Sequence, residues 1–411
     1  MVAYIDRVNV GFVSGALQRE LGLGNAEYGF GAGLFFLGYF LFEIPSNLIL
    51  EKVGARLWIA RILIVWGLVS MATVFVTGKW SFYAMRVLLG VAEAGFFPGI
   101  VLYLTYWIPA RERARNGALF MTAAPVAILV GAPLSEVLLR LDGWLGVKGW
   151  HWLFLVEGLP AVVLGLAALW VLTDRPEQAG WLAADERAWL SAEMAREREA
   201  RVRHGASWRS LLDGRVLLLC LIYCLNTTVT YGIFLWLPRM IEEALGRRSF
   251  VAVMVPFAFA LVAMVLVGRH SDRTGERQWH VAGSALVAAF GLALAAAFQA
   301  EPFMLVVSLT ICQMGQRSVQ PTFWTLPPLL LGGTAAAAGI ALVNAIGNLG
   351  GQIGPWAMGA LREQTHGYRG GLLLLAGVLA LQAALVLSLR LPSRAGGRGP
   401  LSPPVGRSIE S

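Results

Sequence analysis

The sequence predicts an all-α membrane protein in which twelve transmembrane helices form two pseudo-symmetric six-helix bundles. Of the 411 residues, 57% are hydrophobic and only 14% are charged, whereas a soluble protein carries about 25% charged residues. A soluble fold has too little interior to bury that many apolar side chains. In addition, two polar loops, residues 47–56 and 268–277, resemble each other. Aligning Gly54 with Gly275 offsets them by about half of the chain, which indicates a duplicated bundle.

Apolar runs of about 20 residues, the length that a helix needs to cross about 30 Å of hydrocarbon, recur along the chain with short polar breaks between them. Six such runs lie on each side of a polar centre. The predicted spans are 1–17, 27–50, 57–77, 80–107, 116–140, 152–173, 216–240, 250–268, 279–299, 303–330, 335–361 and 369–391.

These spans divide the chain into four parts. Residues 1–173 form the first bundle and residues 216–391 the second. Residues 174–215 carry charges of both signs and predict a helical cytoplasmic linker. The remaining residues, 392–411, are rich in Gly, Pro, Ser and Arg and predict a disordered cytoplasmic tail.

The first predicted span is short at its start. Met1 lies five residues before Asp6, whereas a charged group at mid-membrane needs about ten residues of helix on either side. A signal peptide does not account for this start, since its basic segment and cleavage site are absent. We therefore expect that the first helix is N-terminally truncated and that the gene extends upstream by roughly 20–30 codons.

The distribution of Lys and Arg predicts that both termini are cytoplasmic, because short cytoplasmic loops retain basic residues. The opposite loops hold scattered charges such as Arg19, Lys79, Arg140 and Lys148. The net charge of +8 follows from this topology and from lipid headgroups, so no nucleic-acid partner is expected. The cytoplasmic set consists of Lys52, Arg56, Arg111, Arg113, Arg115, Arg269, Arg273, Arg277, the linker arginines and the tail.

Charged residues inside the spans indicate a functional site, because each costs about 2.5–3.5 kcal/mol to insert into a membrane. The first span contains Asp6 and Arg7. The fourth contains Arg86 and Glu93, which seven residues of helix place on nearly one face and about 10 Å apart along the axis. The alternative is a set of buried ion pairs that only fix helix register.

The intramembrane polar groups of the second half are expected to be neutral. Asn344 and Asn348 are spaced i and i+4, so they share a helix face, and nearby glycines allow close helix approach. These groups either line the functional site or only form hydrogen bonds between helices. Tyr39, in the second span, likewise either packs or contacts a ligand. The neutral groups are Asn226, Gln313, Trp324, Asn344 and Asn348, and the glycines are Gly347, Gly350, Gly351 and Gly354.

Other chemistry is not indicated. Cys220, Cys224 and Cys312 lie inside apolar spans and show neither a disulfide framework nor a metal spacing. The sequence contains no catalytic triad and no phosphate-binding loop, so we predict no enzyme activity, no metal and no cofactor. The histidines fall at loops or span ends, which leaves proton coupling to carboxylates.

The loop at 268–277 resembles the signature loop of the major facilitator superfamily, and Arg86-Val-Leu-Leu-Gly90 resembles the fourth-helix motif of that family. More narrowly, the chain from Tyr4 to about Leu391 resembles the anion:cation symporter branch, which includes bacterial tartrate, phthalate and sugar-acid carriers. The segments that carry this resemblance are Tyr4-Ile-Asp-Arg-Val-Asn-Val-Gly11, Glu43-Ile-Pro-Ser-Asn47, residues 90–99, Tyr103-Leu-Thr-Tyr-Trp107 and Arg111-Glu-Arg-Ala-Arg115.

The resemblance implies a proton-coupled carrier of organic carboxylates that rocks its two halves around a central site. Members of this branch pair a first-helix Asp-Arg with a fourth-helix Arg and Glu. Sugar-acid carriers also line the site with further aromatic and polar residues. The matching positions here are Asp6, Arg7, Arg86 and Glu93, and then Tyr4, Tyr39, Trp324 and Asn344. Pro321 and Ala124 stand where some sugar-acid carriers place polar groups, which leaves the hydroxyl pattern of the substrate open.

Physical chemistry suggests a role for each charged residue. Arg7 presents a planar donor fork and is the predicted substrate anchor. Arg86 is either a second anchor or the partner that keeps Glu93 ionised. Glu93 is the predicted proton-coupling group, and Asp6, expected to pair with Arg7, is its rival.

The cytoplasmic loops are expected to latch the halves, with Asp272 reaching the end of a neighbouring helix. The residues of this predicted gate are Glu51, Lys52, Arg56, Asp272, Arg273 and Arg277.

The predicted partners are a small organic anion, protons and membrane lipid, and the chain is expected to act as a monomer in the bacterial inner membrane.

Three alternative functions are compatible with the same fold. A proton-driven multidrug efflux antiporter would favour a more apolar cavity, and a carboxylate uniporter would dispense with Glu93. A transporter-like sensor would need a larger signalling extension than the linker and tail provide.

Overall fold

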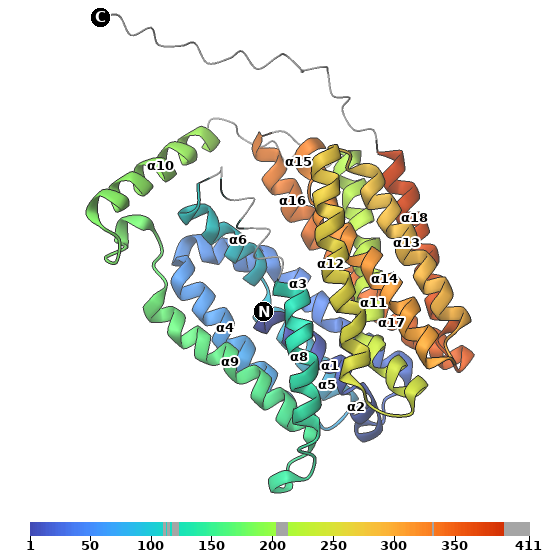
Figure 1. Ribbon diagram of the computed structural model, residues 1–411. Helices are drawn as coiled ribbons and strands as arrows, with labels where there is room; N and C mark the ends of the chain where they lie inside the picture. The colour runs from blue at the N-terminus through green and yellow to red at the C-terminus, as the bar shows by residue number, and fades with distance from the viewer. Residues whose placement is uncertain (110–111, 113–115, 117–122, 203–212, 331–332, 390–411) are drawn as a thin grey trace, which may run out of the picture.

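The computed structural model describes residues 1–109, 112, 116, 123–202, 213–330 and 333–389, and these residues form helices without any strand (Figure 1). The helices of the first half are α1 (Val2–Phe12), α2 (Ser14–Leu21), α3 (Asn25–Val53), α4 (Ala55–Ala72), η1 (Thr73–Phe75), α5 (Lys79–Glu93), α6 (Phe96–Trp107), α8 (Ala123–Leu139), η2 (Trp144–Gly146) and α9 (Gly149–Val171). Two helices follow in the predicted linker, η3 (Pro176–Gln178) and α10 (Ala184–Val202). The second half contains α11 (Gly214–Leu245), α12 (Phe250–Thr274), α13 (Gln278–Ala297), α14 (Pro302–Phe323), α15 (Leu326–Leu330), α16 (Gly333–Asn348), α17 (Gly350–Thr365) and α18 (Arg369–Ser388).

The predicted all-α fold is confirmed, since helix is found in each of the twelve predicted spans. Within the described residues, eight helical segments are long and apolar enough to cross a membrane. The other four predicted spans correspond to α1 with α2, to α8, to α14 with α15, and to α16 with α17. The tail at 392–411 lies outside the described residues.

Four spans that the sequence presents as continuous are broken into two helices each. The first is interrupted at Val13 and the fourth at Ala94 and Gly95; the tenth is interrupted at Trp324 and the eleventh at Leu349. Gly95 adopts a φ of 83°, which is strained for any residue with a Cβ, so glycine is required at that break. The breaks matter for the site, because a helix end frees backbone groups in the interior of the bundle.

The two halves meet along pairs of helices: α3 packs on α17, α8 on α12 and α1 on α11. Glycine makes the α3–α17 contact close. A Cβ on Gly33 would lie only 2.9 Å from the Cα of Gln352, so the two backbones touch here. At Gly347, Gly350, Gly351 and Gly354 a Cβ would likewise collide with a neighbouring helix, as the sequence predicts.

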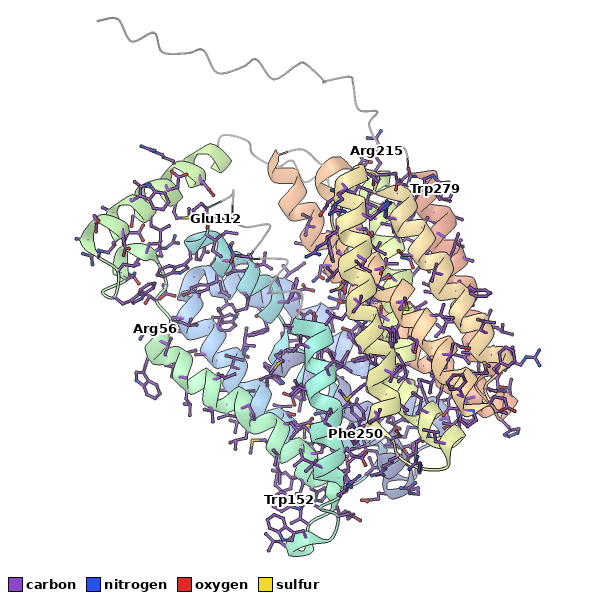
Figure 2. All side chains as sticks on the ribbon, in the orientation of Figure 1. Arg56, Glu112, Trp152, Arg215, Phe250 and Trp279 are labelled. Carbon is purple, nitrogen blue, oxygen red and sulfur yellow. The ribbon has the colours of Figure 1, made fainter. Side chains whose placement is uncertain are left out.

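The outer surface of both halves is apolar. Large hydrophobic side chains on α9, α12 and α13 remain about half exposed, with Leu164 at 49%, Phe259 at 56% and Phe290 at 59%. Contiguous apolar surface of this kind is covered by lipid in a membrane protein. Figure 2 shows Arg215 and Trp279 at one end of the bundle and Trp152 at the opposite end.

Candidate functional site

A cavity lies between the two halves, lined by side chains from both. Five of the six predicted substrate-binding residues line it: Tyr4, Arg7, Tyr39, Trp324 and Asn344. They come from α1, α3, the α14–α15 break and α16, which are far apart in the sequence. The structure therefore brings together at one place groups that the sequence analysis selected separately.

Arg7 is held at the first-half wall of this cavity by an ion pair and three aromatic rings. Its Nε donates a hydrogen bond to Glu93 Oε1 at 2.7 Å, and its Nη2 contacts the same oxygen. The guanidinium carbon lies 5.6, 5.3 and 5.2 Å from the ring centroids of Tyr4, Phe35 and Tyr39, within the range of cation–π attraction. The Arg7 side chain is 12% exposed and that of Glu93 only 1%. Glu93 therefore sits behind Arg7, and a ligand in the cavity meets the guanidinium first.

The prediction that Asp6 pairs with Arg7 is wrong. Asp6 is buried, and its Oδ1 accepts hydrogen bonds from Ser70 Oγ at 2.9 Å and from Asn9 Nδ2 at 3.3 Å. Consecutive residues of a helix point about 100° apart. Arg7 consequently faces the cavity, while Asp6 faces α4 inside the first bundle.

Arg86 makes neither of its two predicted contacts. It is buried, and its Nη2 and Nε donate to the carbonyl oxygen of Ala32 at 3.1 and 3.4 Å. Among the described residues no carboxylate lies within ion-pair distance of Arg86, and it does not line the cavity. The seven-residue spacing explains this arrangement, since about 10 Å along the axis separates Arg86 from Glu93. The ring of Phe35 lies between the two arginines, 5.3 Å from each guanidinium carbon.

A second buried carboxyl lies near Asp6. Glu157 of α9 is 2% exposed, and its Oε1 accepts a hydrogen bond from Ser135 Oγ at 2.8 Å. Within the described part of the chain, neither Asp6 Oδ2 nor Glu157 Oε2 has a hydrogen-bond partner, and no cation pairs with either group. Two buried carboxyls without a cation partner are costly to ionise inside a membrane.

Asn344 and Glu43 connect the halves beside the cavity. Asn344 Nδ2 on α16 donates to Glu43 Oε1 on α3 at 2.8 Å, and both side chains are buried. In the sequence Glu43 stands out only as part of a motif. This hydrogen bond gives it a specific contact with a predicted site residue.

The expectation that the second half is neutral inside the membrane is wrong, because α14 carries Arg317. This residue is 8% exposed and lines the cavity. Its guanidinium carbon lies 5.4 Å from the ring centroid of Phe234 and 5.6 Å from that of Phe257. A search of every predicted span for charged residues would have found Glu43, Glu157 and Arg317 in the sequence.

Some of the neutral polar groups line the cavity, and others form hydrogen bonds between helices. Gln316 Nε2 donates to the backbone oxygen of Asn226 at 3.0 Å and to Asn226 Oδ1 at 3.1 Å, which is interhelical hydrogen bonding between α14 and α11. Asn226 also lines the cavity, as does Asn348. Gln313 is buried away from it. Trp324 packs against Tyr223 with ring centroids 4.8 Å apart.

Among the described residues, the hydrogen bonds of the predicted gate residues do not connect the two halves. Arg277 Nη1 donates to Asp272 Oδ1 at 2.6 Å and to Ser271 Oγ at 2.9 Å. The backbone N–H of Arg56 donates to Asp174 Oδ1 at 2.8 Å, which places a carboxylate at the start of α4. Glu51, Lys52 and Arg273 are exposed, while Arg111, Arg113 and Arg115 lie outside the described residues.

The sequence matches the Major Facilitator Superfamily over residues 1–355. The chain belongs to this family. It is 49% identical to a protein of Agrobacterium vitis named "Putative tartrate transporter" over 406 residues, which cover 97% of this chain and 93% of that one. It is also 41% identical to the "Quinolone resistance transporter" of Acinetobacter baumannii, with 92% and 88% of the two chains covered.

Among solved structures, the chain is similar in fold to the inward-open xylose transporter XylE from E. coli. The TM-score is 0.77 at 15% sequence identity, and 96% of each chain is covered. Together with the family match, this similarity confirms an integral membrane protein with the predicted superfamily fold. The family and these relatives are transporters, and nothing in them points to catalytic activity.

Proposed function

We propose that this transporter is a proton-coupled symporter that takes up a small organic carboxylate across the bacterial inner membrane. The observation that carries the proposal is the position of Arg7, whose guanidinium faces the cavity while its far side is paired with buried Glu93. A guanidinium fork in a partly dry cavity is a strong binding group for a carboxylate.

Coupling follows from competition for this guanidinium. A substrate carboxylate and the Glu93 carboxylate are both anions that bind Arg7, so each weakens the hold of the other. A proton on Glu93 removes its charge and frees the guanidinium for the substrate. Substrate and proton are then carried together as the two halves rock around the cavity.

The charge balance inside the first half also supports proton uptake. It buries four carboxyls, those of Asp6, Glu43, Glu93 and Glu157. Two guanidiniums, those of Arg7 and Arg86, lie in the described part of the four spans that carry these carboxyls. Arg61 lies in another span of this half, near the start of α4, and stacks over Trp58. Full ionisation would leave two uncompensated negative charges in lipid, which is costly, so protons are the natural counterions. Glu93 is the proposed coupling group because it alone pairs with the anchor, and Asp6 remains its rival.

The proposed substrates are tartrate, a sugar acid or an aromatic acid, and the name of the Agrobacterium relative favours the first. The orientation is proposed to place both termini in the cytoplasm, with the gate loops Glu51–Arg56 and Asp272–Arg277 latching the halves on that side. Multidrug efflux is the second candidate function, because a relative at 41% identity is named for quinolone resistance. Two guanidiniums at the cavity favour an anionic ligand over a hydrophobic cation.

Uptake assays in proteoliposomes test this proposal. Tartrate, galactonate and phthalate would be offered with an imposed pH gradient and, separately, an imposed voltage. We expect at least one acid to accumulate against its concentration gradient when the outside is acidic. Entry that stops at equal concentrations on both sides would indicate a uniporter, and proton-driven extrusion of a drug without carboxylate uptake would indicate efflux.

A further inference from the structure

Arg317 is a buried positive charge that lacks a counterion. Among the described residues no carboxylate lies within ion-pair distance of it, and its Nε has no hydrogen-bond partner. The aromatic rings of Phe234 and Phe257 lie 5.4 and 5.6 Å from the guanidinium carbon. An unpaired charge in the membrane interior is costly, and such residues persist where they face a polar cavity and meet a partner there. Arg317 lines the central cavity, so an anion bound there would meet its guanidinium.

Arg317 and Arg7 face this cavity from opposite halves. Both line it, as do Tyr4 of α1 and Tyr231 of α11. The remaining polar side chains of the second-half wall are neutral, among them Thr230 and Gln320. Each half therefore contributes one guanidinium to the described lining of the cavity.

We propose that the transported acid is a dicarboxylate, with one carboxylate bound by Arg7 and the other by Arg317. The inference rests on the proposed carboxylate transport and narrows its substrate class. A ligand of this kind bridges the two halves. A monocarboxylate can bind only one of the two guanidiniums at a time.

Charge balance links this substrate class to the proton. Arg7, Arg317 and Glu93 together carry a charge of +1 when all are ionised. A monoanion neutralises that charge without a proton. A dianion brings the cavity to −1, and protonation of Glu93 restores neutrality. Competition at Arg7 acts on both kinds of ligand, but only the dicarboxylate leaves an excess negative charge, so it takes up more protons when it binds.

Matched pairs of ligands test the proposal on the purified full-length protein by calorimetry. Threonate is tartrate with one carboxylate replaced by a hydroxymethyl group, and benzoate is phthalate without its second carboxylate. For wild type we expect at least tenfold tighter binding of the diacid in one of these pairs. Measurements in buffers of different ionisation enthalpy should show uptake of about one proton with the diacid and a smaller uptake with the monoacid.

Variants then assign the effect to Arg317. Arg317→Gln should weaken binding of the diacid at least tenfold and of the monoacid less than threefold, while Arg317→Lys restores part of the loss. Arg215→Gln is the matched control, because Arg215 is exposed at the start of α11 (Figure 2). Arg7→Gln should weaken both ligands.

Different results separate this inference from the proposed function. Equal affinity for diacid and monoacid in wild type, with no difference in proton uptake, would overturn the dicarboxylate assignment and leave carboxylate transport standing. Equal weakening of both ligands by Arg317→Gln and Arg317→Lys would also overturn it, since that pattern indicates a structural role. If wild type binds neither member of either pair, the proposed function fails together with the inference.

Discussion

The two halves of the transporter have similar architecture but differ in the charges that they bury. The first half buries Asp6, Glu43, Arg86, Glu93 and Glu157, whereas among the described residues of the second half only Arg317 is both buried and charged. Within the described parts of the two halves, every buried carboxyl lies in the first half. A guanidinium keeps its charge at any relevant pH. The difference supports the proposal that proton-linked changes occur in the first half, while the second half supplies a constant positive charge.

Within the first half, α1 has the cavity on one side and the interior of the bundle on the other. Arg7 and Glu93 form a compensated pair at the cavity, where a ligand can reach the guanidinium. Asp6, one residue earlier, faces Ser70 in the interior of the bundle. Buried charges close together in the sequence therefore differ in whether the substrate can reach them.

The largest expected effect comes from removing the titratable group beside the anchor. Glu93→Gln mimics the protonated state, so substrate exchange between the two sides of a proteoliposome should persist while accumulation driven by a pH gradient is lost. The matched variant is Asp6→Asn, assayed in both modes. Intact gradient-driven accumulation in Glu93→Gln would exclude Glu93 as the essential proton carrier. Selective loss in Asp6→Asn would move that role into the bundle interior.

Replacing Arg7 with Lys keeps the positive charge and tests whether Arg7 of the first half or Arg317 of the second is the main binding group for the substrate. Arg7→Lys loses the donor fork, so substrate binding should weaken by about 1–3 kcal/mol, or roughly 5–150-fold. Membrane insertion should be retained. Calorimetry on purified protein measures the affinity, with exposed Arg140→Lys as the control. An unchanged affinity would place the main anchor elsewhere, and Arg317 is then the first residue to examine.

The hydrogen bond between Asn344 and Glu43 tests whether the halves depend on each other at the cavity. A double-mutant cycle of Asn344→Ala and Glu43→Ala should show a coupling of about 1–2 kcal/mol in the free energy of unfolding, measured by chemical denaturation in detergent. A cycle of Asn348→Ala with Glu43→Ala is the control, because Asn348 lies one helical turn away. Equal coupling in both cycles would mean that the specific hydrogen bond contributes nothing.

The gate loops should give the smallest effect. Asp272 pairs with Arg277 at an exposed site, and exposed pairs contribute at most about 1 kcal/mol to stability. Asp272→Asn should therefore leave the thermal unfolding midpoint almost unchanged but slow transport about twofold, if this pair opens during the rocking motion. Glu51→Gln, in the corresponding loop of the first half, should slow it less. An unaltered rate in Asp272→Asn would remove these loops from the gate.

The sequence by itself determined the fold class, the approximate spans and the family. It also identified Tyr4, Arg7, Tyr39, Trp324 and Asn344, which the structure places around one cavity. Long apolar runs and charged loops are local signals, and the membrane thickness converts them directly into helices. The breaks at Gly95, Trp324 and Leu349 were not visible in this way, because the apolar pattern continues through them.

Only the tertiary structure decided which charged groups meet. Glu93 pairs with Arg7, 86 residues away, instead of with Arg86 on its own span, and Asp6 turns away from its sequence neighbour. The charges of Glu43, Glu157 and Arg317 can be read in the sequence, but whether each faces the cavity, the other half or the bundle interior cannot. The rotation of each helix about its axis and the choice of packing partner determine these directions. Both result from contacts between segments far apart in the chain, which spacing within one span does not encode.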